Sequence, residues 1–199
     1  MDYSNLSAMQ IDTLREVGNI GTGNAATALS QLLNKKVDMT VPSINILPFN
    51  KVFESVGEDQ IVVGVILRIL GDIPGNILFV FDKKTALDMV SSLIGQKSDE
   101  LTEMGNSAIC EIGNIIGTSY MNAIARFTGL VVTPSVPAVT YDMLGAILST
   151  TFIESGQFDE NVLDIETLFV EDNSEINGHF YYIPMPGSLE KILSSLGVA

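Results

Sequence analysis

The sequence predicts an α+β fold in which two copies of an α-β-β-β-α unit form one pseudo-two-fold domain, with long helices packed on an antiparallel sheet. One observation is a polar motif whose four positions recur 95 residues later: Asp12-x3-Glu16-x2-Asn19-x22-Pro42 and Ser107-x3-Glu111-x2-Asn114-x22-Pro137. Another is that the order of helical and strand-like segments repeats along the chain. The third is that strand-like segments follow one another in hairpins, which favours α+β over a parallel α/β sheet.

The first half begins with a long helix. Ser7-x-x-Gln10 resembles a capping box, so the helix is predicted to run from about Ser7 to Asn34. Alternating residues predict a strand at 37–47, followed by a short helical piece near 50–56. Further strands at 60–70 and 76–81 are joined by a turn, and Thr85 can cap a closing helix that ends near 93: the turn is Gly71-Asp72-Ile73-Pro74-Gly75.

The second half repeats this order, with its displacement growing from 95 to 103 residues before the second hairpin. It predicts a helix at 98–127, a strand at 130–140, a helical stretch near 143–153, strands near 162–170 and 179–183 joined by a turn at 173–178, and a final helix. One unit alone leaves a sheet edge and a sheet face that a sister unit could cover. We therefore expect a single domain, 1–199, made of repeats 1–97 and 98–199.

The repeated polar residues share one helix face. Positions separated by four and then three residues lie within about 60° of arc on a helix, so Asp12, Glu16 and Asn19 form one group, and Ser107, Glu111 and Asn114 form the other. Apolar residues on the opposite side predict that each group faces solvent. A single such triplet would be ordinary for a solvated helix face, but its repetition in register with a distant proline indicates a function.

Three glycines within the first predicted helix need a reason, because each costs about 1 kcal/mol relative to alanine. By helical angle, Gly18 and Gly21 point toward the core and would permit close packing, whereas Gly23 lies on the polar face and would let another backbone approach. Pro42 and Pro137 fall within strand-like segments, which predicts sheet edges or bulges there. Each proline either borders the polar face or makes a purely structural bend.

Composition excludes several functional classes. A net charge of −14 with only ten scattered Lys and Arg argues against nucleic acid and favours protein partners. No apolar run is long enough for a membrane span, and the N-terminus lacks a signal-peptide pattern, so we expect a cytoplasmic protein. A single Cys110 and a single His179 leave no zinc ligand cluster and no intramolecular disulfide.

Other site chemistries fit the pattern poorly. The Gly-x-x-Gly-x-Gly string resembles a nucleotide loop, but it lies within a predicted helix and follows no strand. Nothing brings Glu16 and Glu111 together as a catalytic carboxylate pair, and His179 accompanies no nucleophile motif. An Asn carboxamide is too weak a base for general base catalysis, but it can hold a water for attack. Such a site requires a substrate that is reactive by itself, and an acyl phosphate on another protein fits.

The duplicated motif resembles the CheC branch of the CheC/CheX/FliY chemotaxis phosphatases, and the resemblance covers the whole chain. It implies dephosphorylation of the phosphorylated response regulator CheY, which would supply its own Mg²⁺, so no cofactor of the chain's own is expected. By position, Asn19 and Asn114 would orient the attacking water, and Glu16 and Glu111 would anchor the regulator through a lysine. The supporting positions of the motif would be Asp12, Ser107, Pro42 and Pro137.

The resemblance leaves an alternative open. The protein could be a non-enzymatic sink for phosphorylated CheY, or an adaptor that binds the receptor deamidase CheD. The two halves differ at the first motif position and around Gly21-Thr22-Gly23 against Ile116-Gly117-Thr118, so equal activity of the two sites is not implied.

Overall fold

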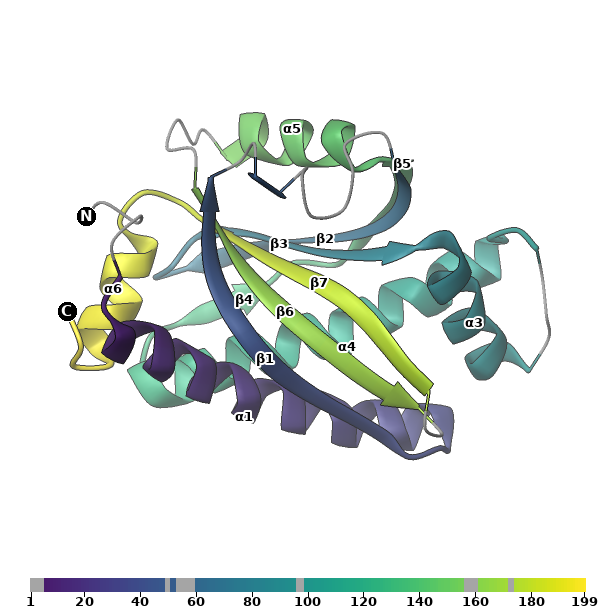
Figure 1. Ribbon diagram of the computed structural model, residues 1–199, viewed down its shortest axis with the longest axis horizontal. Coiled ribbons are helices and arrows are strands. Elements are labelled where there is room, and N and C mark those ends of the chain that lie inside the picture. The colour runs from purple at the N-terminus through teal and green to yellow at the C-terminus, as the bar shows by residue number, and fades with distance from the viewer. Residues whose placement is uncertain (1–5, 49–50, 53–59, 96–98, 156–160, 172–173) are drawn as a thin grey trace.

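A computed structural model describes residues 6–48, 51–52, 60–95, 99–155, 161–171 and 174–199 (Figure 1). Within these residues seven strands form one antiparallel sheet with helices on both faces, and neighbouring strands are not always consecutive in the chain. The long helices α1 (Ala8–Leu33) and α4 (Glu103–Thr128) lie side by side and antiparallel against one face, and α5 (Leu144–Ser155) covers the other. Two shorter helices, α3 (Lys83–Ile94) and α6 (Ser188–Ser195), lie at opposite ends of the α1–α4 pair.

The sheet order shows the pseudo-two-fold arrangement. The strands are β1 (Val37–Pro48), β2 (Ile61–Gly71), β3 (Gly75–Asp82), β4 (Val132–Pro134), β5 (Ala138–Met143), β6 (Asn161–Glu171) and β7 (Ser174–Pro184). Their order is β1-β6-β7-β3-β2-β4, and β5 also pairs with β2. The hairpins β2–β3 and β6–β7 meet at the centre through β3 and β7. The first strand of each half pairs with the hairpin of the other half, so each half completes its sister's sheet.

The helix starts follow local capping. The predicted capping box is present, because Gln10 N–H donates to Ser7 Oγ and Ser7 N–H donates to Gln10 Oε1. The start predicted at 98 is wrong, since Thr102 caps α4 by accepting from Gly105 N–H. Thr85 is not the cap of α3 either: Asp82 accepts from Thr85 N–H, and a carboxylate is a strong N-cap group. Of the helical piece predicted near 50–56, only 51–52 are described, and they are helical; the rest lies outside the described residues.

Two strand predictions also need correction. The strand expected at 130–140 is divided into β4 and β5, because the three residues 135–137 lie opposite only two residues of β2 and Pro137 has no N–H to donate. The turn expected at 173–178 is mostly strand: β7 begins at Ser174, and its register with β6 continues from Glu171↔Ser174 to Leu163↔Tyr182. Residue 173 lies outside the described residues.

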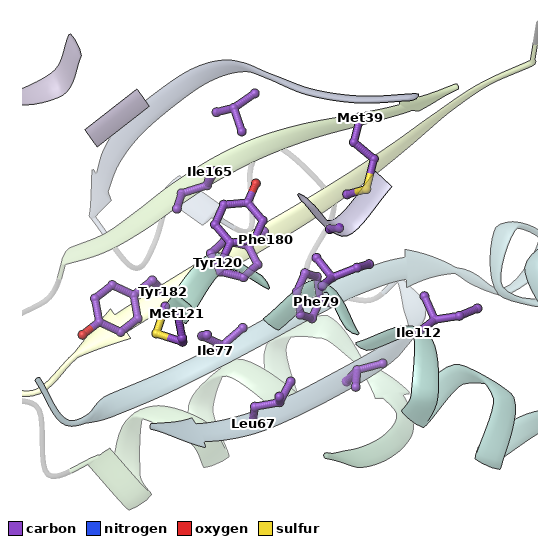
Figure 2. Packing of buried hydrophobic residues seen from close by; sticks show 14 of the residues in the cluster. Met39, Leu67, Ile77, Phe79, Ile112, Tyr120, Met121, Ile165, Phe180 and Tyr182 are labelled. Atoms are coloured by element: carbon purple, nitrogen blue, oxygen red, sulfur yellow. The ribbon is translucent and has the colours of Figure 1, made fainter. Parts of the chain in front are cut away.

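The larger core cluster lies between the sheet and the α1–α4 pair (Figure 2). Tyr120 stacks on Phe180 with 4.4 Å between ring centroids, and Phe180 contacts Phe79 at 4.8 Å. Gly21 is buried as predicted, and a Cβ there would be 3.0 Å from Tyr120 Cα. This glycine therefore lets the two long helices approach closely, which fixes the positions of their outward faces.

Candidate functional site

In the α4 copy, the motif residues line an open groove of about 600 Å³ beside β4 and β5. Glu111 and Ser107 are exposed, and Asn114 is half-buried. The opposite wall is the segment between the two strands, with Ser135, Val136 and Pro137. The Thr118 hydroxyl, one turn farther along the helix, lies 3.4 Å from Asn114 Oδ1. The carboxamide therefore stands at the edge of a space that a partner can enter.

The far wall of this groove is held by specific contacts. Ser135 is fixed to β2, because Arg68 N–H donates to Ser135 Oγ at 2.9 Å and Ser135 N–H donates to Arg68 O at 2.8 Å. The half-buried Cys110 thiol lies 3.7 Å from the Pro137 carbonyl oxygen, a weak hydrogen bond from helix to wall. Burial raises the pKa of Cys110, so the thiol keeps its proton at neutral pH.

In the α1 copy, the Asn has a different environment. Asn19 Oδ1 accepts a hydrogen bond from Val41 N–H on β1 at 3.0 Å, so the amide oxygen is turned toward the neighbouring strand. Asp12 is paired with Arg15 at 2.7 Å on the helix surface. Glu16 is exposed, and in the described part of the chain no hydrogen bond or ion pair reaches its carboxylate or that of Glu111.

Beside each motif, the neighbouring strand has a bulge at the same position of its repeat. The register of β1 against β6 shifts between Thr40 and Ser43, around Val41-Pro42. At the corresponding place in the second half, three residues between Pro134 and Ala138 face two residues of β2. The predicted bulges at Pro42 and Pro137 are thus present, both on strands at the sheet edges.

The two bulges turn their valines in opposite directions. Val41 is 3% exposed and belongs to the core, whereas Val136 is 89% exposed. A bulge leaves a backbone N–H without a ladder partner. In the α1 copy that N–H donates to Asn19 Oδ1, which ties the motif face to the strand. In the α4 copy the valine points outward and the groove is open.

Some residues of the site were not found from the sequence. Thr118 and the two valines lie outside the motif, although Thr118 is four residues after Asn114 and therefore shares its face. Met9 and Met104 also went unnoticed: they are 68% and 65% exposed, three residues before Asp12 and Ser107. The 95-residue spacing between Met9 and Met104, equal to that of the motif, could have identified them from the sequence. Within the described residues no group of three or more His, Cys, Asp or Glu is arranged to hold a metal ion.

Comparison with known proteins finds the same duplication. A model of the CheC-like family matches residues 9–46 and 104–141, two segments that are themselves 95 residues apart. The chain is 35% identical to the CheY-P phosphatase CheC of Bacillus subtilis (strain 168), over 99% of this chain and 98% of that protein. The chain belongs to the CheC-like family. The CheC-like match covers both Glu–Asn pairs and both bulges.

Solved structures support the same CheC-like fold. FliY of Thermotoga maritima matches with a TM-score of 0.80 at 22% identity, covering 96% of this chain and 98% of that one. A chain from the CheX-CheY-BeF3-Mg+2 complex of Borrelia burgdorferi matches with a TM-score of 0.54 at 18% identity, covering 82% and 95%. Among the described helices of this CheC-like chain, none combines the length and apolarity needed to cross a membrane.

Proposed function

We propose that this protein is a cytoplasmic phosphatase that hydrolyses the aspartyl phosphate of a phosphorylated CheY-type response regulator. The observation that carries the proposal is the duplicated Glu–Asn pair, of which the α4 copy presents Asn114 at an open groove. Its relative in Bacillus subtilis, named a CheY-P phosphatase, aligns over nearly the full length of both chains. A complex of CheX with CheY, from a structural neighbour, supports a regulator of the same class as the partner.

The proposed mechanism assigns positioning to this chain. Asn114 Oδ1 accepts a hydrogen bond from a water molecule and so directs the water oxygen at the phosphorus, in line with the aspartyl oxygen that leaves. The water oxygen forms the new bond to phosphorus as the bond to the aspartyl oxygen breaks, which yields phosphate and a free carboxylate. The Mg²⁺ belongs to the regulator and neutralises the phosphoryl oxygens. The Glu111 carboxylate, unpaired in the described part of the chain, anchors a lysine of the regulator.

The supporting residues have positioning tasks in this proposal. Pro137 keeps the groove wall out of the ladder, and Ser107 stands one turn before Glu111 on the same face. Asp12 holds Arg15 away from Glu16, while Pro42 belongs to the bulge that supplies Val41 N–H to Asn19. We propose that changes at these four positions have smaller effects than changes at the Glu and Asn residues.

The test is phosphate release from acyl-phosphorylated CheY by the purified protein. The double variant Asn19→Ala/Asn114→Ala is expected to lose about 10²-fold or more of the rate, as for the removal of a preorganised transition-state group. Its matched control is Asn122→Ala, an exposed Asn of α4 that lies outside the motif and outside the residues lining the groove. A double variant with the wild-type rate would refute the water-orienting role.

A second function is favoured by the α1 copy. Because Asn19 Oδ1 is already hydrogen-bonded while Glu16 remains exposed, this copy is better suited to binding than to hydrolysis. The protein would then act partly as a sink for phosphorylated CheY. Tight binding with phosphate release at the regulator's intrinsic rate would favour this alternative. Release measured with and without CheD tests the expected CheD adaptor role.

A further inference from the structure

A hollow of about 710 Å³ opens beside Glu16, on the side of α1 away from β1. It lies where the N-terminal half of α1 meets the C-terminal ends of α4 and α6. Its apolar wall consists of Met9, Val17, Ile20, Phe127 and Leu196. The motif residues Asp12 and Glu16 line the same hollow, so an apolar surface is continuous with the polar face.

The exposed members of this wall are large. Met9 is 68% exposed and Phe127 is 47% exposed, although the helices that carry them also bury apolar residues such as Leu14 and Ile112 in the core. Solvent-exposed apolar side chains gathered at the rim of a polar site are typical of a protein contact surface. Met side chains adapt their shape to a partner, and an aromatic ring offers a rigid contact.

The exposed residues of this wall have counterparts in the second copy. Met104 corresponds to Met9, and Leu32 corresponds to Phe127, each at a displacement of 95 residues and each exposed. In each pair the methionine is on the helix that carries the motif, and the second apolar residue is on the other, antiparallel helix. Repetition of both exposed side chains is the reason to relate them to the repeated Glu–Asn site.

The charge of the hollow limits what can occupy it. Asp12 is neutralised by Arg15 at 2.7 Å, which leaves the Glu16 carboxylate as the charge beside the apolar wall. A complementary surface therefore carries a cation next to an apolar side chain. Under the proposed function, on which this inference rests, the regulator already brings a lysine to Glu16. We propose that the hollow binds an aromatic or aliphatic side chain of the same regulator, next to that lysine, and so adds a docking contact outside the motif.

The experiment isolates the α1 copy. In a Glu111→Ala background, binding of CheY held in its phosphorylated state by beryllium fluoride is measured by fluorescence anisotropy, and hydrolysis of phosphorylated CheY is measured in parallel. Phe127→Ser and Met9→Ser are each expected to weaken binding by about tenfold and to raise KM, with kcat within about twofold of the background. The control is Ile153→Ser, an 80% exposed residue of α5 on the other face of the sheet.

Each outcome bears on the proposal. Thermal melts identify a variant that fails to fold, and the other variant then decides. Unchanged affinity in a folded Phe127→Ser or Met9→Ser variant overturns the docking contact, as does loss of all binding in the Glu111→Ala background alone. A dimer in sedimentation that Phe127→Ser dissociates also overturns it, because a second copy would occupy the hollow. If the wild-type protein does not hydrolyse phosphorylated CheY but binds it in a way that depends on Phe127, the proposed function is refuted and the docking contact is retained.

Discussion

At the scale of single residues, the two Asn side chains have different hydrogen-bond partners in the free protein. Asn19 Oδ1 accepts from the Val41 N–H of the bulge at 3.0 Å, whereas among the described residues Asn114 Oδ1 accepts only from the Thr118 hydroxyl, at a longer 3.4 Å. An amide oxygen has two lone pairs, and the bond to Asn19 is the shorter of the two, so its lone pair is the more firmly occupied. Asn19 is therefore part of the structure, and Asn114 is more available to a water molecule.

This difference predicts opposite effects of two equivalent substitutions. Asn114→Ala is expected to lower phosphate release by about tenfold with little change in the melting temperature, since the α4 copy loses its proposed water-orienting group. Asn19→Ala is expected to reduce the rate less than twofold but to cost about 1–3 kcal/mol of stability, because Val41 N–H is left without a partner. Phosphate release and urea unfolding of both variants check this; equal rate losses would contradict it.

At the scale of elements, the spacing of the motif has a geometric cause. From Asn19 to the end of α1 the helix advances about 21 Å at about 1.5 Å per residue, and β1 returns about 17 Å from Val37 to Pro42 at about 3.3 Å per residue. The two distances nearly cancel, so the bulge is brought back beside the Asn. The same count applies to α4 and Pro137, which explains why the x22 spacing occurs in both halves.

The helix glycines yield a prediction with a matched pair of substitutions. A Cβ at Gly113 would lie 2.5 Å from Val65 Cγ1, so Gly113→Ala is expected to destabilise the protein by about 1–3 kcal/mol through overpacking. A Cβ at Gly23 would have nothing within 4 Å, so Gly23→Ala is expected to stabilise it by about 1 kcal/mol. Equilibrium urea unfolding measures both, and a stabilised Gly113→Ala variant would show that the α4–β2 packing is looser than described.

Helix periodicity predicted most of what depends on local sequence. The long helices, the Ser7 capping box, the hairpins and the bulges at the prolines are all set by residues near one another in the chain. The division of β4 from β5 and the opposite orientation of Val41 and Val136 depend on which strand of the other half lies alongside. That pairing is a long-range property, so the sequence left the relative activity of the two sites open, whereas the structure gives the two Asn side chains different hydrogen-bond partners.

At the scale of the whole molecule, the exchanged first strands predict that neither repeat folds alone. β1 pairs with β6 over ten positions from Val37↔Glu171 to Pro48↔Asn161, β5 pairs with β2, and β3 pairs with β7. A separated half therefore exposes the unpaired edges of all its strands that bind the other half, and the apolar face of its long helix. Fragments 1–97 and 98–199 are each expected to be largely unfolded by circular dichroism and to regain the native spectrum when mixed. A fragment that melts cooperatively by itself would show that the domain consists of two independent units.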